Sequence, residues 1–387
     1  YSFEVDPTAR VSDISVGTKQ KVEILKALFR GAKILILDEP TAVLTPQETE
    51  ELFKQLKSLK EKGHTIIFIS HKLNEVKELC DRLTVMRRGT TIGTYQVSDV
   101  SEEDISRLMV GRDVILKVDK KPVAPGKNIL NVQNVTYVNE FGKNALKNVS
   151  FNLREGEILG IAGVEGNGQR EIVDLVTGLQ KIQHGDIEIK DESIKEKSIR
   201  DIRDLGTSHV PEDRMVYGVA ETESVKANVM SYKYTEETYT NKVMQKSKEI
   251  DKLADRLVAD YLIKCSNANQ PVKMLSGGNI QKVVVAREFF AEPDFIICDQ
   301  PTRGIDVGAI EFIRKELVAL REKGTAVLLN SADLNEVLEL SDRLIVMHEG
   351  EIAAFFEDAS KITEEELGLY MLGLKKQSAE EIGRAVQ

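Results

Sequence analysis

The stretch that decides the fold is Ile34-Leu-Ile-Leu-Asp-Glu-Pro-Thr41, an apolar run that ends in two carboxylates. It recurs at an offset of 261 residues as Phe295-Ile-Ile-Cys-Asp-Gln-Pro-Thr302. Short unbroken apolar runs beside helical patterns, such as residues 47–62, are typical of strands buried on both faces of a parallel sheet. The sequence therefore predicts an α/β fold in which each copy of this stretch is a central strand.

The same offset relates much more of the chain without a gap. A second apolar strand, residues 65–69, recurs around residues 325–329. Polar motifs match as well, and the matched pairs are Ser15-Val-Gly17 with Ser276-Gly-Gly278, Leu73-Asn-Glu-Val76 with Leu334-Asn-Glu-Val337, and Asp81-Arg-Leu83 with Asp342-Arg-Leu344. The chain therefore contains two related units.

A segment rich in Lys, Pro and Gly separates the two units and is typical of a linker. We expect the first unit over residues 1–113, the linker over 114–127, the second unit over 128–375 and a tail over 376–387.

Within the second unit, we expect a hairpin from residues 129–138 and 146–153, and then a strand at 157–162. The composition from residue 215 to 290 is charged and helical. This part predicts a helical subdomain inserted in the sheet domain.

A glycine-rich loop, Gly163-Val-Glu-Gly-Asn-Gly-Gln169, follows the strand at 157–162. Its counterpart in the first unit would fall at 163 − 261 = −98. We therefore expect the chain to be a fragment whose first unit lacks this loop. A first residue of Tyr1 rather than Met agrees with that interpretation.

Composition limits the classes of function. The 387 residues include 53 basic and 63 acidic side chains, a net charge of −10, which disfavours a nucleic-acid-binding surface. No apolar run approaches the ~20 residues that span a bilayer, and no signal peptide is recognisable. We expect an acidic, cytoplasmic protein that reaches a membrane only through a partner, with Cys80, Cys265 and Cys298 as reduced thiols.

The first copy carries groups suited to phosphate chemistry. Asp38 and Glu39 lie at the carboxyl end of a strand, where open α/β sheets bind ligands. Asp38 is placed to hold Mg²⁺ through water, and Glu39 to polarise the water that attacks a γ-phosphate. His71, directly after the next strand, can donate to that phosphate.

The second copy retains the scaffold and changes the reactive groups. The glycine loop can cradle phosphates, but Gln169-Arg170 replaces the usual Lys and Ser or Thr. Glu39 corresponds to Gln300 and His71 to Ala332, while Glu212 stands where a phosphate-sensing Gln is expected. The sequence predicts that this copy binds nucleotide and does not hydrolyse it.

The string Leu275-Ser-Gly-Gly-Asn-Ile-Gln281 offers a hydroxyl and bare N–H groups at a helix start. This string resembles the signature of ATP-binding cassette proteins. Asp38-Glu39 and Asp299-Gln300 resemble the ends of their Walker B strands, and His71 resembles their switch histidine. The resemblance covers nearly the whole chain and implies two P-loop NTPase cassettes in tandem, each with an inserted helical subdomain, and ATP and Mg²⁺ as cofactors.

In that family two cassettes face each other head to tail, and each signature completes the ATP site of the other. The resemblance implies one hydrolytic site, formed by Asp38, Glu39 and His71 with Ser276, Gly277 and Gly278. The opposite site would combine the second metal-facing carboxylate, the glycine loop and the altered first signature, which comprise Asp299, Gly163, Gly166, Asn167, Gly168, Gln169, Arg170, Glu171, Ser15 and Gly17. Tyr137 resembles the aromatic residue that stacks on adenine, although a packed strand tyrosine fits the pattern equally well.

A finer resemblance is to tandem ATPases of bacterial importers for simple sugars and nucleosides. It rests on Ser15–Ile24, Gly166–Gln169, Pro211-Glu-Asp-Arg214 and Pro301–Gly308. Thr41–Gln47, Val164-Glu-Gly166 and Gln300 look more like the nucleoside importers, with ribose and galactose importers as the alternative. This resemblance implies transmembrane permease subunits, an extracytoplasmic substrate-binding protein and a place at the cytoplasmic face of the membrane.

Two other classes stay open from the sequence. A tandem cassette acting in translation would carry two intact signatures and a basic linker, whereas Ile14-Ser-Val-Gly17 is altered and the linker is short. A regulatory module without catalysis would explain the second copy but not why Glu39 and His71 are retained.

Overall fold

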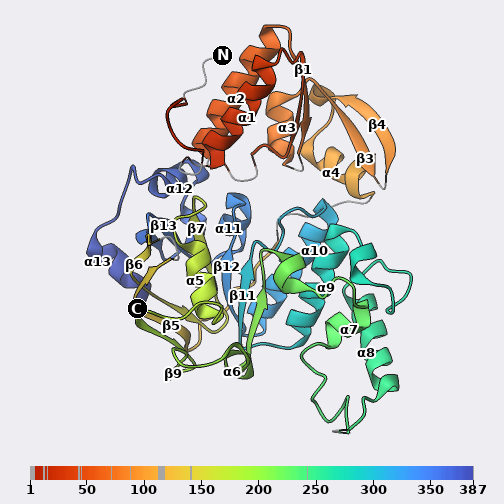
Figure 1. Cartoon of the computed structure of the whole chain (residues 1–387), viewed down its shortest axis with the longest axis vertical. Helices are drawn as coiled ribbons and strands as arrows, with labels where there is room; N and C mark the ends of the chain where they lie inside the picture. The colour runs from red at the N-terminus through yellow and green to blue at the C-terminus, as the bar shows by residue number, and fades with distance from the viewer. Residues whose placement is uncertain are drawn as a thin grey trace.

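The structure is a computed structural model. It describes residues 5–11, 14, 16–41, 44, 46–70, 72–87, 89–111, 118–139, 142–241 and 243–386. The first unit lies at one end of the molecule and the second forms the larger remainder (Figure 1). Within the described ranges, no helix combines the length and apolar composition needed to cross a bilayer.

The second unit is built on a six-stranded sheet in the order β10-β11-β12-β7-β13-β14. All neighbours pair in parallel except the β13–β14 hairpin. The strands are β7 (Ile158–Gly163), β10 (Thr207–Val210), β11 (Phe295–Asp299), β12 (Ala326–Asn330), β13 (Arg343–His348) and β14 (Glu351–Phe356). β11 and β12 are buried along their whole length, as their unbroken apolar sequence predicts.

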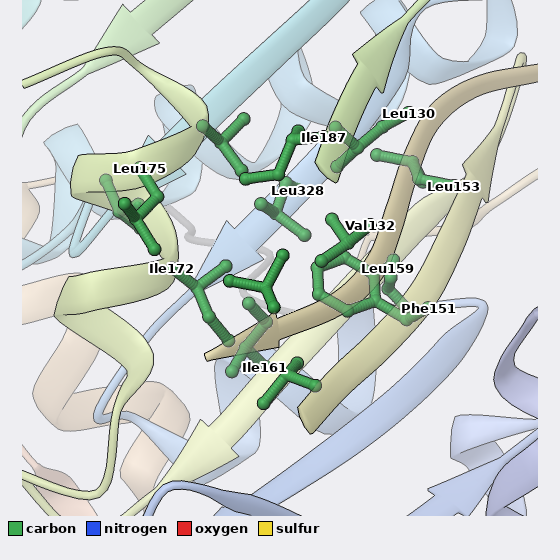
Figure 2. Packing of buried hydrophobic residues seen from close by; sticks show 14 of the residues in the cluster. Leu130, Val132, Phe151, Leu153, Leu159, Ile161, Ile172, Leu175, Ile187 and Leu328 are labelled. Atoms are coloured by element: carbon green, nitrogen blue, oxygen red, sulfur yellow. The ribbon is translucent and has the colours of Figure 1, made fainter. Parts of the chain in front are cut away.

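An antiparallel sheet in the order β6-β5-β8-β9 packs against one face of this sheet. Its strands are β5 (Asn128–Val138), β6 (Asn144–Arg154), β8 (His184–Ile189) and β9 (Glu192–Ser193), which confirms the predicted hairpin. Figure 2 shows Val132 and Phe151 of this sheet meeting Leu159 and Ile161 of β7, with Ile172 of α5 (Gln169–Val176) beside them.

The predicted helical subdomain is present between β10 and β11. Its helices are α7 (Val225–Met230), α8 (Ser247–Asp260), the short η3 (Val272–Met274) and α9 (Gly277–Phe290), preceded by a single turn, η2 (Arg214–Gly218). α7, α8 and α9 share a separate apolar core that includes Val229, Leu257 and Val283. The other helices of the second unit are α6 (Ile199–Asp204), α10 (Val307–Glu322), α11 (Leu334–Leu340), η4 (Ala359–Lys361) and α12 (Glu364–Met371).

The first unit repeats part of the second, element by element. Its elements are α1 (Val16–Phe29), β1 (Ile34–Asp38), α2 (Pro46–Glu61), β2 (Thr65–Ile69), α3 (Leu73–Leu79), β3 (Arg82–Arg87), β4 (Thr90–Gln96), η1 (Val97–Asp99) and α4 (Glu102–Val110). At the 261-residue offset, α1 corresponds in sequence to α9, α2 to α10 and α3 to α11. β1–β2 and β3–β4 are separate ladders, and among the described residues nothing takes the place that β7 has between β12 and β13.

The expectation that strands of both copies are buried on both faces is wrong for the first unit. Ile34 and Ile36 of β1 are 60% and 67% exposed, whereas their counterparts Phe295 and Ile297 are fully buried. Phe295 and Ile297 pack against the antiparallel sheet and α5, which lie between residues 128 and 194. The first unit has no corresponding segment in this chain, so the same sequence pattern leaves one face of β1 open.

The described part of the expected linker, residues 118–127, lies along the second unit. Lys120 Nζ donates to the carbonyl oxygens of Leu340 and Ser341, and the Lys121 N–H donates to Glu322. The expected tail is folded as well, with α13 (Ala379–Ile382) and η5 (Gly383–Val386), and Gln377 bonds to β14 at both its backbone and its side chain.

The two units touch through reciprocal contacts. α2 of the first unit packs on α12 of the second, and α10 of the second packs on α4 of the first. Because α10 is the counterpart of α2 and α12 that of α4, these two contacts are equivalent under the repeat. Such self-matching contacts are what an approximate two-fold relation produces. Gln47 Nε2 donates to the carbonyl of Glu365 across the α2–α12 contact.

The matched pair Ile36 and Ile297 tests this description of the core. We expect Ile297→Ala to lower the free energy of unfolding of the second unit by about 2 to 5 kcal/mol, because it opens a cavity in a buried sheet. Ile36→Ala should cost less than about 1 kcal/mol, since that side chain is already exposed. Urea unfolding followed by circular dichroism measures the free energy of unfolding of both variants. An equal decrease in the two variants would contradict this description of the core.

Candidate functional site

The glycine loop lies between β7 and the first turn of α5. Gly168 precedes α5 with φ of 113°, a left-handed conformation that side chains rarely adopt. A Cβ at Gly168 would stand 2.7 Å from Leu146 Cδ2 and 2.9 Å from the Ala145 carbonyl oxygen. Only glycine fits, and the bare N–H groups of the loop stand at a helix N-terminus, where anions bind.

The loop is held in place by neighbouring turns. The Gly350 N–H donates to the Asn167 carbonyl at 3.0 Å, and the Glu349 N–H donates to Asn167 Oδ1 at 3.0 Å. Lys143 Nζ lies 3.4 Å from the carbonyl oxygen of Gly166. Asn167 therefore connects the glycine loop to the β13–β14 turn through hydrogen bonds. Lys143 places an ammonium group at the edge of the glycine loop.

A cavity of about 280 Å³ opens above the loop. Glycine-loop residues line it together with residues that follow β11 and β12, with Met371 of α12 and with Leu44 of the first unit; the polar members of the lining include Gln169, Arg170, Glu171, Glu212, Gln300, Arg303, Asn330 and Ser331. The cavity therefore lies where the two units meet.

The loop itself supplies little positive charge. Gln169, at the position of the usual Lys, is buried and turns its Nε2 back to the carbonyl of Val164 at 3.2 Å. Arg170, at the position of the usual hydroxyl residue, is exposed, with Nε 3.9 Å from Asp174 Oδ2. Phosphate in this cavity would be held mainly by backbone N–H groups, with Arg170 and Arg303 as the cations of the lining.

Asp299 ends β11 under the cavity and is almost fully buried. Burial raises the pKa of Asp299 to about 7, with Glu212 and Asp174 adding to the shift, while the hydrogen bond from Asn330 opposes it. Asn330 Nδ2 donates to Asp299 Oδ1 at 2.6 Å. In the first copy Asp38 is exposed, and its partner in register is Ile69, which has no side-chain donor.

The positions after these aspartates share an unusual backbone. Glu39 and Gln300 have φ values of 43° and 50°, in a region that costs free energy for residues with a Cβ. Their N–H groups donate to the carbonyls of Ile69 and Asn330, which fixes the tight turn. Gln300 Oε1 accepts the Ala332 N–H at 2.9 Å, so its side chain is turned to the loop that follows β12.

The signature lies at the N-terminus of α9. Ser276 is exposed and precedes the helix, and its Oγ accepts from Asn279 Nδ2 at 2.8 Å. A Cβ at Gly277 would lie 3.0 Å from Arg214 Nη2, and one at Gly278 would lie 2.8 Å from Asp306 Oδ2. Both glycines thus allow charged side chains to approach the start of α9.

A polar bridge connects this signature to the cavity. Arg214 donates to the carbonyls of Arg303 and Gly304 at 2.9 and 3.3 Å. The Arg303 guanidinium in turn donates to the Glu212 carboxylate. The motifs Pro211–Arg214 and Pro301–Gly308 are therefore joined in space, which the sequence alone did not reveal.

The far end of α9 is anchored by a buried carboxylate. Glu288 is fully buried and pairs with Arg203 at 2.6 Å and Arg287 at 2.9 Å, and it accepts the His209 N–H at 3.2 Å. The two arginines lower the pKa of Glu288 against the opposing effect of burial. Burial also lowers the pKa of the neighbouring His209 to about 4, so that ring is neutral at pH 7.

The structure brings together most of the residues predicted for the second site. Gly163, Gly166, Gln169, Arg170 and Glu171 line one cavity, and Asp299 is hydrogen-bonded to Asn330 of the same lining. Tyr137 is 8% exposed, packs in the main apolar cluster and does not line the cavity. Its place in the core favours the packed strand tyrosine over an adenine platform.

The sequence also predicts Ser15, Gly17 and His71 as site residues. Ser15 and His71 lie outside the described residues, and Gly17 is the second residue of α1. Sequence reasoning missed Arg303, Asn330 and Leu44. Arg303 directly follows Pro301-Thr302, and Leu44 lies three residues after Thr41, so their nearness to the two repeated Pro-Thr pairs was the available signal.

A larger hollow of about 740 Å³ lies at the opposite edge of the sheet. It is lined by the C-terminal ends of α8, α9 and α10 and carries no glycine-loop or signature residue. The glycine-loop residues that suit phosphate binding therefore line the smaller cavity only.

Comparisons with known proteins agree with this geometry. The family described as ABC transporter matches residues 3–42 and 146–303. The chain is 43% identical over 377 residues to the glucose import ATP-binding protein TsgD13 of Haloferax volcanii, covering 96% of this chain and 68% of that protein. It is 42% identical over 379 residues to the guanosine import ATP-binding protein NupO of Bacillus subtilis, covering 98% of this chain and 74% of that protein.

Solved structures show the same cassette architecture. A dimeric ATP-binding cassette in a post-hydrolysis state with ADP and Pi is 25% identical, with a TM-score of 0.51 over 59% of this chain and 98% of that one. The family match and the extent of identity to these import ATPases show that the chain belongs to the ABC transporter family of ATPases.

Proposed function

We propose that this chain is the ATP-binding and hydrolysing subunit that powers an ABC importer, with nucleosides as cargo. The observation that carries the proposal is the contrast between the two copies at the ends of β1 and β11. One copy retains Asp38 and Glu39, and the other has Gln300 bonded to Ala332 and Asp299 bonded to Asn330. A driven transport cycle needs at least one site that hydrolyses ATP.

The two units would form two composite nucleotide sites between them. The reciprocal α2–α12 and α10–α4 contacts support a two-fold arrangement, and Leu44 of the first unit already lines the cavity over the second glycine loop. The hydrolytic site would join the first copy to Ser276, Gly277 and Gly278. The second site would join Gly163–Glu171 to the altered signature around Ser15 and Gly17.

In the hydrolytic site, Glu39 would polarise the attacking water and His71 would donate to the γ-phosphate. Glu39 stands in a turn with a φ of 43°, directly after the carboxyl end of β1. Asp38 fits Mg²⁺, because its carboxylate is exposed and faces an isoleucine instead of an amide. Mg²⁺ would neutralise phosphate charge there while being held largely by phosphate oxygens and water.

In the second site, nucleotide would be held and not cleaved. The loop retains the close backbone approach at Gly168, so the phosphate cradle fits. Metal binding fits less well, since Arg170 replaces the hydroxyl ligand and Asn330 occupies one oxygen of Asp299. Among the described residues, no group of three His, Cys, Asp or Glu side chains is arranged to hold a metal ion.

The choice of nucleosides rests on analogy, because the ATPase does not touch the cargo. Gln300 and the Thr41–Gln47 segment support it, as do the relatives named for guanosine import and for nucleoside import in Lactococcus lactis. A sugar importer is the second candidate, supported by the 43% identical glucose import relative and by the ribose import relatives.

The proposed function requires partner proteins. Permease subunits would span the membrane and a substrate-binding protein would deliver cargo from outside, with this chain at the cytoplasmic face. The import names of the relatives support both partners.

The asymmetry predicts unequal mutants in a reconstituted transporter whose ATPase carries both phosphate loops. Glu39→Gln should reduce ATP-driven uptake of labelled guanosine on the order of 10²–10⁴-fold, since it removes the general base. Gln300→Glu should leave uptake largely intact, because the Ala332 N–H would engage the new carboxylate and His and Lys stay absent. An equal decrease in uptake for both variants would refute the asymmetry between the two sites. Uptake of ribose or glucose, and not of guanosine, would show that the cargo is a sugar.

Nucleotide retention at the second site depends on Gly168. Gly168→Val should lower bound ATP analogue from two to about one per chain in the Glu39→Gln background, because its side chain meets Leu146 and the Ala145 carbonyl. Gly324→Val is the matched control, since Gly324 has a φ of 103° and open space around its Cβ position. One nucleotide per chain before the substitution would show that the second site is empty.

A further inference from the structure

A buried carboxylate lies behind the hydrolytic groups of the first unit. Glu75, near the start of α3, is 5% exposed. Thr41 Oγ1 lies 2.7 Å from both of its carboxylate oxygens, and Ser70 Oγ donates to Oε2 at 3.2 Å. Glu75 thus joins two loops that leave neighbouring parallel strands, β1 and β2.

These two loops carry the reactive residues. Thr41 lies two residues after Glu39, and Ser70 directly precedes His71. Ser70 Oγ also accepts the Lys72 N–H at 3.0 Å, so the hydroxyl is fixed from both sides of position 71. A shift of Glu75 would therefore move the segments before and after the reactive positions together.

The second unit contains the same arrangement at the 261-residue offset. Thr302 and Ser331 donate to Glu336 at 2.9 and 2.7 Å, and the Asp333 N–H donates to Ser331 Oγ at 3.1 Å. Glu336 is fully buried. The threonine, serine and glutamate of this group, which we name the hydroxyl clamp, are thus retained where Glu39 and His71 have been replaced.

The cation that pairs with the glutamate of the hydroxyl clamp comes from a different sequence position in each copy. In the first unit Lys72 Nζ lies 3.3 Å from Glu75 and 3.3 Å from the Thr41 carbonyl oxygen. In the second unit Asp333 replaces Lys72, and Arg314, whose counterpart is Phe53, reaches Glu336 at 3.3 Å. A buried carboxylate needs a partner, so each copy has its own cation for the same anion.

We propose that Glu75 is a positioning residue of the hydrolytic site, which through Thr41 and Ser70 holds the loop after Glu39 and the loop of His71 at a fixed separation. The inference rests on the proposed function, since it concerns hydrolysis in the first unit. Glu75 touches no nucleotide in this account and acts through the loops that it joins. Misplacement of reacting groups by about 1 Å can cost ~10²-fold in rate.

Thr41→Val tests the clamp, because it removes the hydroxyl and keeps the shape. In the ATPase that carries both phosphate loops, we expect kcat to fall on the order of 10- to 100-fold while KM for ATP changes less than about threefold. Thr41→Ser should restore kcat to within about threefold, since it returns the donor. Circular dichroism of the same variants in the 387-residue chain reports folding, and Ser70→Ala replaces Thr41→Val if that variant unfolds.

Thr302→Val is the matched control in the second unit and should leave kcat within about threefold, because that copy does not hydrolyse. The clamp is overturned if Thr41→Val retains full kcat, if Thr302→Val lowers kcat as much, or if Thr41→Ser gives no recovery. A wild-type protein without ATPase activity would overturn the proposed function instead, so the two failures are distinguishable.

Discussion

The site depends on the parallel register of β7, β12 and β11. That register pairs Asp299 with Asn330 and Asn330 with Ile161, so the carboxyl ends of three strands reach one edge of the sheet. The glycine loop, Asp299 and the turn at Gln300 meet there because each lies at or directly after the carboxyl end of one of these strands. Strand packing on both faces keeps the edge in place, since the apolar side chains of β11 and β12 are fully buried.

The two copies differ in how their polar groups are used at this edge. In the second copy the Asn330 amide engages Asp299, the Ala332 N–H engages Gln300, and Gln169 turns back into its own loop. Each of these hydrogen bonds satisfies a group that a phosphate or a water would otherwise contact. Backbone geometry is retained while side-chain reactivity is lost, which favours nucleotide retention over cleavage.

Much of the fold followed from the sequence, because strands and helices repeat at a fixed offset. The α/β class, the hairpin and the helical part before β11 are confirmed. The prediction that β1 is buried on both faces was wrong. An apolar sequence pattern shows which side chains a strand can bury, but it does not show whether the segments that would pack on them are present. Ile36 and Ile297 have the same pattern and opposite exposure.

The site was only partly predictable for a related reason. Gly168, Asp299 and Gln300 stand in motifs whose spacing identifies them, whereas Arg303, Asn330 and Glu75 act through contacts between segments far apart in the chain. Tyr137 was ambiguous, since a strand tyrosine and an adenine platform have the same sequence signature, and its burial came from packing against the second sheet.

We infer that one site cleaves ATP and the other holds it. Single-turnover analysis of an ATPase with both phosphate loops tests it most directly, using ATP labelled in the adenine, removal of unbound nucleotide and separation of the bound products. Two nucleotides should be bound per chain, and they should end as equal amounts of ADP and ATP. Conversion of both nucleotides to ADP would contradict it.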